Sequence, residues 1–201
     1  MAEEQNKIQT LEEPVGDYGI EYTYADYLKF EFEEMVEIIR GRIFRMSPAP
    51  ISSHQKISVN LSGLIWSFLR GKKCQIFSAP FDVILPVANK KRETATTVVQ
   101  PDICVICNPD MIEEAGCFGA PDWIIEILSP HTRKKDFQLK YDVYEEAGVA
   151  EYWIVMPLEK LIEVFVLENG KYKRIKTYAQ DDEVTSHTLP DLTLNLEEVF
   201  E

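Results

Sequence analysis

The chain has 201 residues, of which 45% are hydrophobic, and its 34 acidic against 21 basic residues give a formal net charge of −13. A chain of this length and composition can form one ordinary hydrophobic core, so we expect a single domain over residues 21–201. The acidic, polar residues 1–20 are expected to form a flexible leader. The excess of negative charge argues against a protein that coats nucleic acid without specificity, because such binding depends on basic side chains that neutralise phosphates.

The sequence gives no sign of a membrane or secretory destination. No apolar run is long enough to span a bilayer, and the N-terminus lacks the basic and apolar regions of a signal peptide. We therefore expect a cytoplasmic protein with no membrane partner, in which the four cysteines are reduced thiols rather than a disulfide framework. Cys104 and Cys107 are three residues apart in a predicted strand. They should therefore point to opposite faces and lie in the core rather than form a zinc or redox motif.

The first third of the chain predicts a short helix, a hairpin and a long helix. The short helix is expected over residues 23–31, and two strand-like runs flank a turn at Arg40-Gly41. The stretch "SSHQKISVNLSGLIWSFLRG" then has apolar residues at helical spacing, with Ser52 or Ser53 expected to cap its start and Gly71 to end it.

The rest of the chain reads as strands with one further amphipathic helix. We expect that helix over residues 131–147, with Gly148 as its end, and strands in "CQIFSAPFDVILPV", "TVVQPDICVICNP", "DWIIEIL", "AEYWIVMP" and "LIEVFVLENGKYKRIKTY". The last of these contains a hairpin turn at Asn169-Gly170. This order predicts a mixed central sheet flanked by helices, in the α/β or α+β class.

Two carboxylates occupy unusual positions in the apolar strands. Asp102 follows Pro101 at the opening of one strand, and Glu126 interrupts the apolar run "WIIEILSP" in the next. Because strand side chains alternate, Glu126 lies on one face with Ile124, and the two carboxylates converge if their strands pair. Such a pair is costly to bury unless a cation lies between its members, and Mg²⁺ or Mn²⁺ prefers oxygen ligands.

Each carboxylate also has a structural alternative. Glu126 could be exposed at a bulge or paired with a buried arginine, and Asp102 could hydrogen-bond its own backbone in a turn. Lys140, on the helix over residues 131–147, borders the apolar face and could bury its stem while directing its ammonium group toward the sheet. The alternative for Lys140 is a solvated side chain, or one paired with Asp136.

These residues resemble the PD-(D/E)xK nuclease superfamily and, within it, the Uma-two family. The matching stretches are "VEIIRGRIFRMSPAPISSHQ", "VQPDICVI", "GAPDWIIEILSP", the lysine and tyrosine of "KYDVY", and "GVAEYWIVMP". The resemblance implies a restriction-endonuclease-like fold and Mg²⁺- or Mn²⁺-dependent hydrolysis of DNA phosphodiester bonds. It also implies that Asp102, Glu126 and the backbone carbonyl of Ile127 hold the metal. The superfamily lysine is expected two residues after the glutamate, where this chain has Leu128, so Lys140 is the candidate catalytic lysine.

The resemblance suggests further contacts around this centre. Glu37 and His54 are possible accessory residues, against ordinary roles as an exposed strand residue and a capping or core-edge histidine. Three basic residues after the candidate metal strand are candidate contacts to the nucleic-acid backbone: Arg133, Lys134 and Lys135.

Several functional readings stay open at this stage. A homodimer would suit cleavage of duplex DNA, although the sequence shows no interface. The displaced lysine and the negative charge favour an alternative, a nuclease scaffold that binds nucleic acid or regulates without cutting. RNA and branched or damaged DNA also remain open as substrates.

Overall fold

The computed structural model describes residues 19–31, 35–46, 51–87, 91–129 and 135–201, with side chains described from residue 138 in the last range. All but the last two residues of the expected leader, 1–20, lie outside these ranges. The described α-helices are α1 (Tyr24–Tyr27), α2 (Ser52–Leu69), α3 (Lys135–Ala147) and α4 (Leu196–Phe200). Short 3₁₀ turns lie at Arg92–Thr94 and Pro109–Met111. None of the described helices has the length and apolar character needed to cross a membrane.

The strands within the described ranges form two six-stranded sheets and a small ribbon. Sheet A has the order β2-β1-β5-β4-β8-β7 and contains β1 (Val36–Ile39), β2 (Arg42–Arg45), β4 (Val83–Ile84), β5 (Val98–Val99), β7 (Ile112–Glu113) and β8 (Gly116–Phe118). Sheet B has the order β12-β11-β10-β9-β6-β3 and contains β3 (Gln75–Ser78), β6 (Ile103–Ile106), β9 (Trp123–Ile127), β10 (Glu151–Met156), β11 (Leu161–Glu168) and β12 (Lys171–Ala179). The ribbon pairs β13 (Glu183–Thr185) with β14 (Thr193–Asn195).

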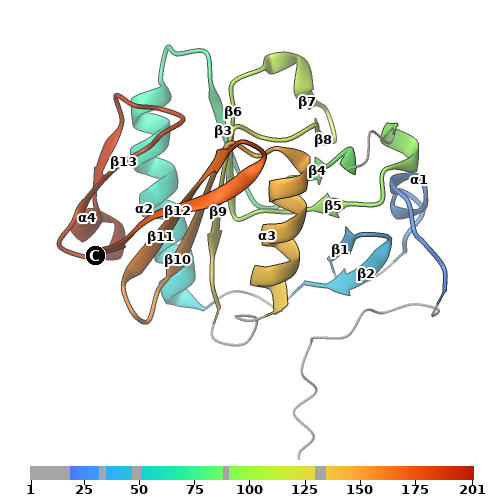
Figure 1. Cartoon of the computed structure of the whole chain (residues 1–201), viewed down its shortest axis with the longest axis horizontal. Coiled ribbons are helices and arrows are strands. Elements are labelled where there is room, and N and C mark those ends of the chain that lie inside the picture. Colours follow the sequence, from blue (N-terminus) through green and yellow to red (C-terminus); the bar gives the residue numbers. More distant parts are fainter. Residues whose placement is uncertain (1–18, 32–34, 47–50, 88–90, 130–134) are drawn as a thin grey trace, which may run out of the picture.

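Sheet B is the centre of the molecule, and its two faces are covered by different elements (Figure 1). One face packs against α2, α4 and the ribbon, in a core that includes Leu61, Trp123 and Trp153. The other face packs against α3 and sheet A, in a second core that includes Ile124 and Tyr144. The alternation of β9 therefore sends Trp123, Ile125 and Ile127 to the α2 side and Ile124 and Glu126 to the α3 side. The predicted mixed sheet flanked by helices corresponds to sheet B.

Sheet A was not predicted as a separate sheet. Two of the runs expected as single strands each divide between the sheets, because β3 and β6 belong to sheet B whereas β4 and β5 belong to sheet A. Pro80 and Pro101 lie at the two divisions, where a residue without a backbone N–H cannot continue a ladder. The segment Gln100-Pro101-Asp102 is therefore the point at which the chain passes from sheet A to sheet B.

The long helix α2 forms where it was predicted, but its start differs in detail. Ile51 is the N-cap residue and makes no side-chain capping bond, whereas Ser52 and Ser53 are the first helical residues and are exposed. The prediction that either serine caps the helix is therefore wrong by one or two residues. Gly71 follows the helix with φ +75°, a conformation that glycine adopts without strain, as expected for a helix end.

The predicted state of two cysteines is also wrong. Cys74 and Cys107 form a disulfide, although the chain was expected to contain only reduced thiols. The cause lies in the register, because β3 pairs with β6 so that Gln75 faces Ile106, and the two cysteines continue that ladder by one position. Cys104 is free and buried on the face opposite Cys107, as the alternation predicted.

The packing of α2 against sheet B gives a testable stability difference within one helix. Leu61 is fully buried, whereas Val59 is 67% exposed. Leu61→Ala is expected to lower the free energy of unfolding by about 2–5 kcal/mol, because it leaves a cavity between α2 and the sheet. Val59→Ala should change it by less than about 0.5 kcal/mol. Urea denaturation of both variants measures this, and equal losses would contradict the packing described.

Candidate active site

Glu126 lies in a strand of which every residue is buried. β9 pairs in parallel with β10 and antiparallel with β6, and all five of its residues are buried. Glu126 is 8% exposed and faces the space between sheet B, α3 and sheet A. A carboxylate in such a place loses its hydration, so its neighbours must supply charge or hydrogen-bond donors.

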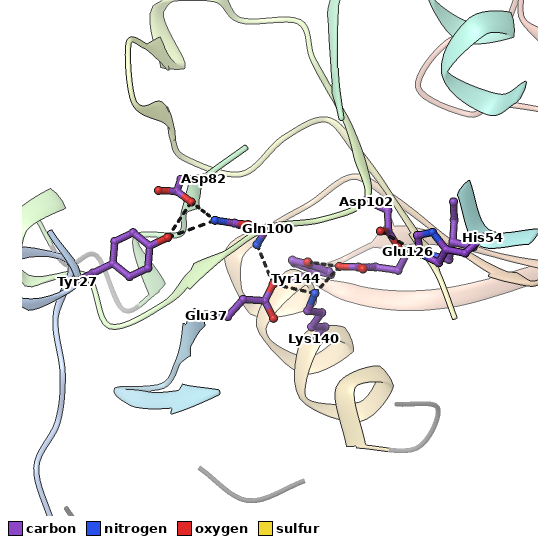
Figure 2. A network of polar contacts seen from close by, with 10 residues as sticks. Tyr27, Glu37, His54, Asp82, Gln100, Asp102, Glu126, Lys140 and Tyr144 are labelled. Atoms are coloured by element: carbon purple, nitrogen blue, oxygen red, sulfur yellow. Dashed lines mark hydrogen bonds and ion pairs between the residues drawn. The ribbon is translucent and has the colours of Figure 1, made fainter. Parts of the chain in front are cut away.

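Lys140 of α3 supplies the positive charge. Its Nζ lies 3.0 Å from Oε1 of Glu126 and 2.9 Å from Oε1 of Glu37, and all three side chains are buried (Figure 2). Lys140 is therefore not a solvated side chain, and the alternative partner Asp136 lies outside the described side chains. Glu37 belongs to β1, so this ion-pair cluster joins sheet A, α3 and sheet B through one ammonium group.

Tyr144 is a member of the cluster that the sequence reasoning did not single out. Its hydroxyl donates to Oε1 of Glu126 at 2.6 Å, and the residue is fully buried. A signal for it was available, because Tyr144 follows Lys140 by four residues and must lie on the same face of α3.

Asp102 lies beside the cluster and is held by two other groups. Its Oδ2 accepts a hydrogen bond from the backbone N–H of Ile127 at 2.7 Å, and its Oδ1 lies 3.2 Å from Nε2 of His54 (Figure 2). β6 pairs with β9 so that Ile103 faces Ile125, which brings Asp102 level with Glu126 at the end of the ladder. Asp102 and Glu126 therefore lie opposite each other on neighbouring strands, and His54 lies next to Asp102.

A second group of polar residues supports Glu37 and was also missed. The backbone N–H of Gln100 donates to Oε1 of Glu37 at 2.8 Å. The Gln100 side-chain amide donates to Oδ1 of Asp82 at 2.7 Å and to the hydroxyl of Tyr27 at 3.3 Å. Figure 2 shows these residues as a continuous polar chain from α1 to Lys140. Nothing in the local sequence pairs them, because they come from three separate segments.

The charges of the cluster do not balance, and this shifts several pKa values. Burial, together with the charges of Asp102 and Glu37, raises the pKa of Glu126 to about 7, although Lys140 and Tyr144 act in the opposite direction. Burial alone would lower the pKa of Lys140, but Glu126 and Glu37 outweigh it and raise that pKa. Burial likewise opposes protonation of His54, but the hydrogen bond and charge of Asp102 raise its pKa. Three carboxylates thus surround one ammonium and one imidazole.

Another buried glutamate shows what a fully satisfied carboxylate looks like in this fold. Glu151, at the start of β10, is completely buried. Its oxygens accept from Trp153 Nε1, Ser186 Oγ and Thr188 N at 2.7 Å each, and from His187 N at 3.0 Å. Through these hydrogen bonds, Glu151 holds the turn after β13 against sheet B. The glutamate of "GVAEYWIVMP" therefore has a structural task.

The predicted nucleic-acid contacts fall largely outside the described part of the chain. Arg133 and Lys134 belong to the range 130–134, which is not described. Lys135 is the first residue of α3, and its side chain is likewise not described. Their role stays a prediction.

The donor set fits a hard divalent cation by its chemistry. Glu37, Asp102 and Glu126 offer carboxylate oxygens, which Mg²⁺ and Mn²⁺ prefer. Their arrangement here is nevertheless that of an ion-pair cluster. Among the residues that the structure describes, no three His, Cys, Asp or Glu side chains are grouped so as to hold a metal ion.

Comparison with known proteins relates this chain to a family of sequences. The sequence model of the Uma2 family, described as "Putative restriction endonuclease", matches residues 23–197. "Uncharacterized protein slr1290" from Synechocystis sp. (strain ATCC 27184 / PCC 6803 / Kazusa) is 30% identical over 133 residues. That match spans 65% of this chain and 66% of the Synechocystis protein, just under two thirds of its length.

A solved structure shares the fold. It is the crystal structure of "a putative nuclease belonging to DUF820" from Anabaena variabilis ATCC 29413, with a TM-score of 0.69 and 23% sequence identity. The likeness covers 89% of this chain and 97% of that one. It confirms the predicted restriction-endonuclease-like fold.

The ion-pair cluster predicts a large difference between two lysines. Lys140→Met leaves Glu37 and Glu126 buried without a cation and is expected to lower the free energy of unfolding by about 3–5 kcal/mol. Lys171, which pairs with Glu145 at the surface, is the matched control. Lys171→Met is expected to cause no measurable loss, because a solvated ion pair contributes little. Urea denaturation at neutral pH measures the free energy of unfolding of both variants. A loss in Lys140→Met as small as that in Lys171→Met would contradict a buried ion-pair cluster.

The raised pKa of Glu126 predicts a pH-dependent difference in stability. Between its ordinary pKa of 4.5 and about 7, the folded protein keeps the proton on Glu126 whereas the unfolded chain releases it. This contribution makes the folded state less stable as the pH rises through that window. Glu126→Gln removes it, so from pH 4.5 to 7 the stability of the variant relative to wild type should increase by roughly 3 kcal/mol.

Urea denaturation across pH 4.5–8 measures that difference. Glu168→Gln is the control, because Glu168 pairs with Lys173 at the surface. A stability difference between Glu126→Gln and wild type that does not change with pH would contradict the charge imbalance.

Proposed function

Because the chain belongs to the Uma2 family of "Putative restriction endonuclease" proteins, we propose that it is a metal-dependent nuclease that hydrolyses phosphodiester bonds in DNA. The observation that carries the proposal is the buried cluster in which Lys140 lies within 3.0 Å of Glu126, with Asp102 at the end of the neighbouring strand. A lysine and two carboxylates from adjacent strands are the groups that this chemistry needs. Each of them is held by other residues of the fold.

Asp102, Glu126 and the backbone carbonyl of Ile127 would hold the Mg²⁺ or Mn²⁺ ion. Such an ion, when bound, polarises a phosphoryl oxygen and lowers the pKa of an attacking water. Lys140 would neutralise the negative charge that develops on the phosphate and orient the water. Glu37 would act by holding Lys140, and His54 by holding Asp102, so we assign both a positioning role.

The proposal extends to the residues that contact the DNA, to the oligomeric state and to the location of the protein. We propose that Arg133, Lys134 and Lys135 contact the DNA backbone, because they directly follow the strand that carries Glu126. Local basic residues would then offset the net charge of −13 at the point of contact. A homodimer, which would bring two such sites to a duplex, and a cytoplasmic location belong to this proposal.

One observation favours a second candidate, a nuclease scaffold that binds nucleic acid or regulates without cutting. Lys140 pairs with Glu126 and Glu37 at once. Its ammonium group then supplies the positive charge that a metal ion would otherwise bring to these carboxylates. If the cluster is only an ion-pair network, the protein needs no metal. Cleavage and metal dependence distinguish the two candidates.

A cleavage assay tests the proposal on supercoiled plasmid, linear duplex, single-stranded DNA and RNA with Mg²⁺ or Mn²⁺. Wild type is expected to cut DNA and to stop when EDTA removes the ion. Asp102→Asn and Glu126→Gln should lower the rate at least roughly 100-fold, because each removes a charged ligand of the ion that polarises the phosphate and activates the water. Glu163→Gln, which alters a carboxylate paired with Arg174 away from the site, should cut like wild type.

Two results would overturn the nuclease reading. One is a wild-type protein that binds DNA but cuts none of the substrates. The other is equal cleavage by Glu126→Gln and wild type, which would point to a contaminating nuclease. Cleavage of RNA alone would support a nuclease whose substrate is RNA rather than DNA.

A further inference from the structure

The two oxygens of Glu126 are in different situations. Oε1 receives both close donors, Lys140 Nζ at 3.0 Å and the Tyr144 hydroxyl at 2.6 Å. No described residue donates to Oε2. Each carboxylate oxygen can accept two hydrogen bonds, so Oε1 is saturated whereas Oε2 keeps its lone pairs.

Lys140 alone would not fix the orientation of Glu126. The ammonium is a compact charge with three freely rotating donors, and Glu37 competes for it at 2.9 Å. A carboxylate held only by a shared point charge can rotate and present either oxygen. The Tyr144 hydroxyl has a defined direction, because the phenol ring is fully buried and packs edge-to-face on Tyr152 at 5.2 Å.

We propose that Tyr144 is a positioning residue of the metal site. Its hydroxyl and the Lys140 ammonium together hold Oε1 of Glu126, so that Oε2 is the oxygen presented to the cation. This inference rests on the proposed function, because it takes Glu126 to be a metal ligand. A group that orients a ligand in this way typically changes metal affinity by about 10–100-fold when it is removed.

A purely structural role for Tyr144 makes different predictions. In that case the hydroxyl only satisfies a buried acceptor, and its removal lowers stability while metal affinity stays the same. Tyr172 is the matched control, because it belongs to the same aromatic core and its buried hydroxyl has no hydrogen-bond partner among the described residues. Both Tyr→Phe changes remove one buried oxygen, but only that of Tyr144 contacts Glu126.

The test measures Mn²⁺ binding to the full chain by calorimetry and by the electron paramagnetic resonance signal of free Mn²⁺. Tyr144→Phe is expected to weaken Mn²⁺ binding about tenfold, and Tyr172→Phe to leave it within about twofold of wild type. In the cleavage assay, Tyr144→Phe should require about tenfold more Mg²⁺ for half-maximal rate and recover most of the rate at saturating Mg²⁺. Thermal unfolding of all three proteins checks that each is folded.

Equal Mn²⁺ affinity of folded Tyr144→Phe and wild type would overturn the inference, as would a wild type that binds no Mn²⁺. If Tyr144→Phe does not fold, a variant with 4-methylphenylalanine at position 144 takes its place, because the methyl group fills the space of the hydroxyl without donating a hydrogen bond. The Mn²⁺ affinity of that variant is then compared with that of wild type. Weakened Mn²⁺ binding with no cleavage by wild type would support the role of Tyr144 and reject the nuclease function. Cleavage by wild type, together with equal Mn²⁺ affinities of wild type and Tyr144→Phe, would support the nuclease function and reject the role of Tyr144.

Discussion

A buried ammonium group cannot remain charged in a protein interior unless carboxylates lie against it, and here those carboxylates come from two different sheets. Lys140 meets Glu126 of sheet B and Glu37 of sheet A, each within 3.0 Å. The electrostatic attraction offsets the loss of hydration only at such distances, so the two sheets and α3 must approach closely at this point. The position of sheet A over the face of sheet B depends on this contact, as does the supply of three carboxylates to one small region.

Residues whose placement follows from local periodicity could be predicted from the sequence. The alternation along β9 was enough to separate Trp123 and Ile125 from Glu126, and the structure has them on opposite faces. The helical spacing of α3 placed Lys140 at the border of the apolar face, from which it reaches Glu126. Both arguments need only the regular geometry of one element. The pairing of the strands that carry Asp102 and Glu126 was a condition of the argument rather than a prediction, and the structure meets it.

Contacts between distant segments could not be predicted in the same way. The disulfide of Cys74 with Cys107 depends on the register of β3 and β6, which no single segment determines. Gln100 acts on Glu37 through its backbone N–H, and a backbone donor leaves no trace in the sequence. The division of two apolar runs between the sheets had a visible cause in Pro80 and Pro101. A proline within an apolar run does not by itself indicate that the two parts of the run belong to different sheets.

The crossing of the chain at Gln100-Pro101-Asp102 ties the completeness of the site to the completeness of folding. A chain that has formed sheet B alone possesses Asp102 and Glu126, but Glu37 and the Gln100 N–H that holds it arrive only when the other sheet docks. Until then Lys140 has one acidic neighbour instead of two, and α3 packs against sheet B alone. A nascent or partly unfolded molecule therefore lacks an assembled centre, and any chemistry performed there begins only after the two halves of the protein have come together.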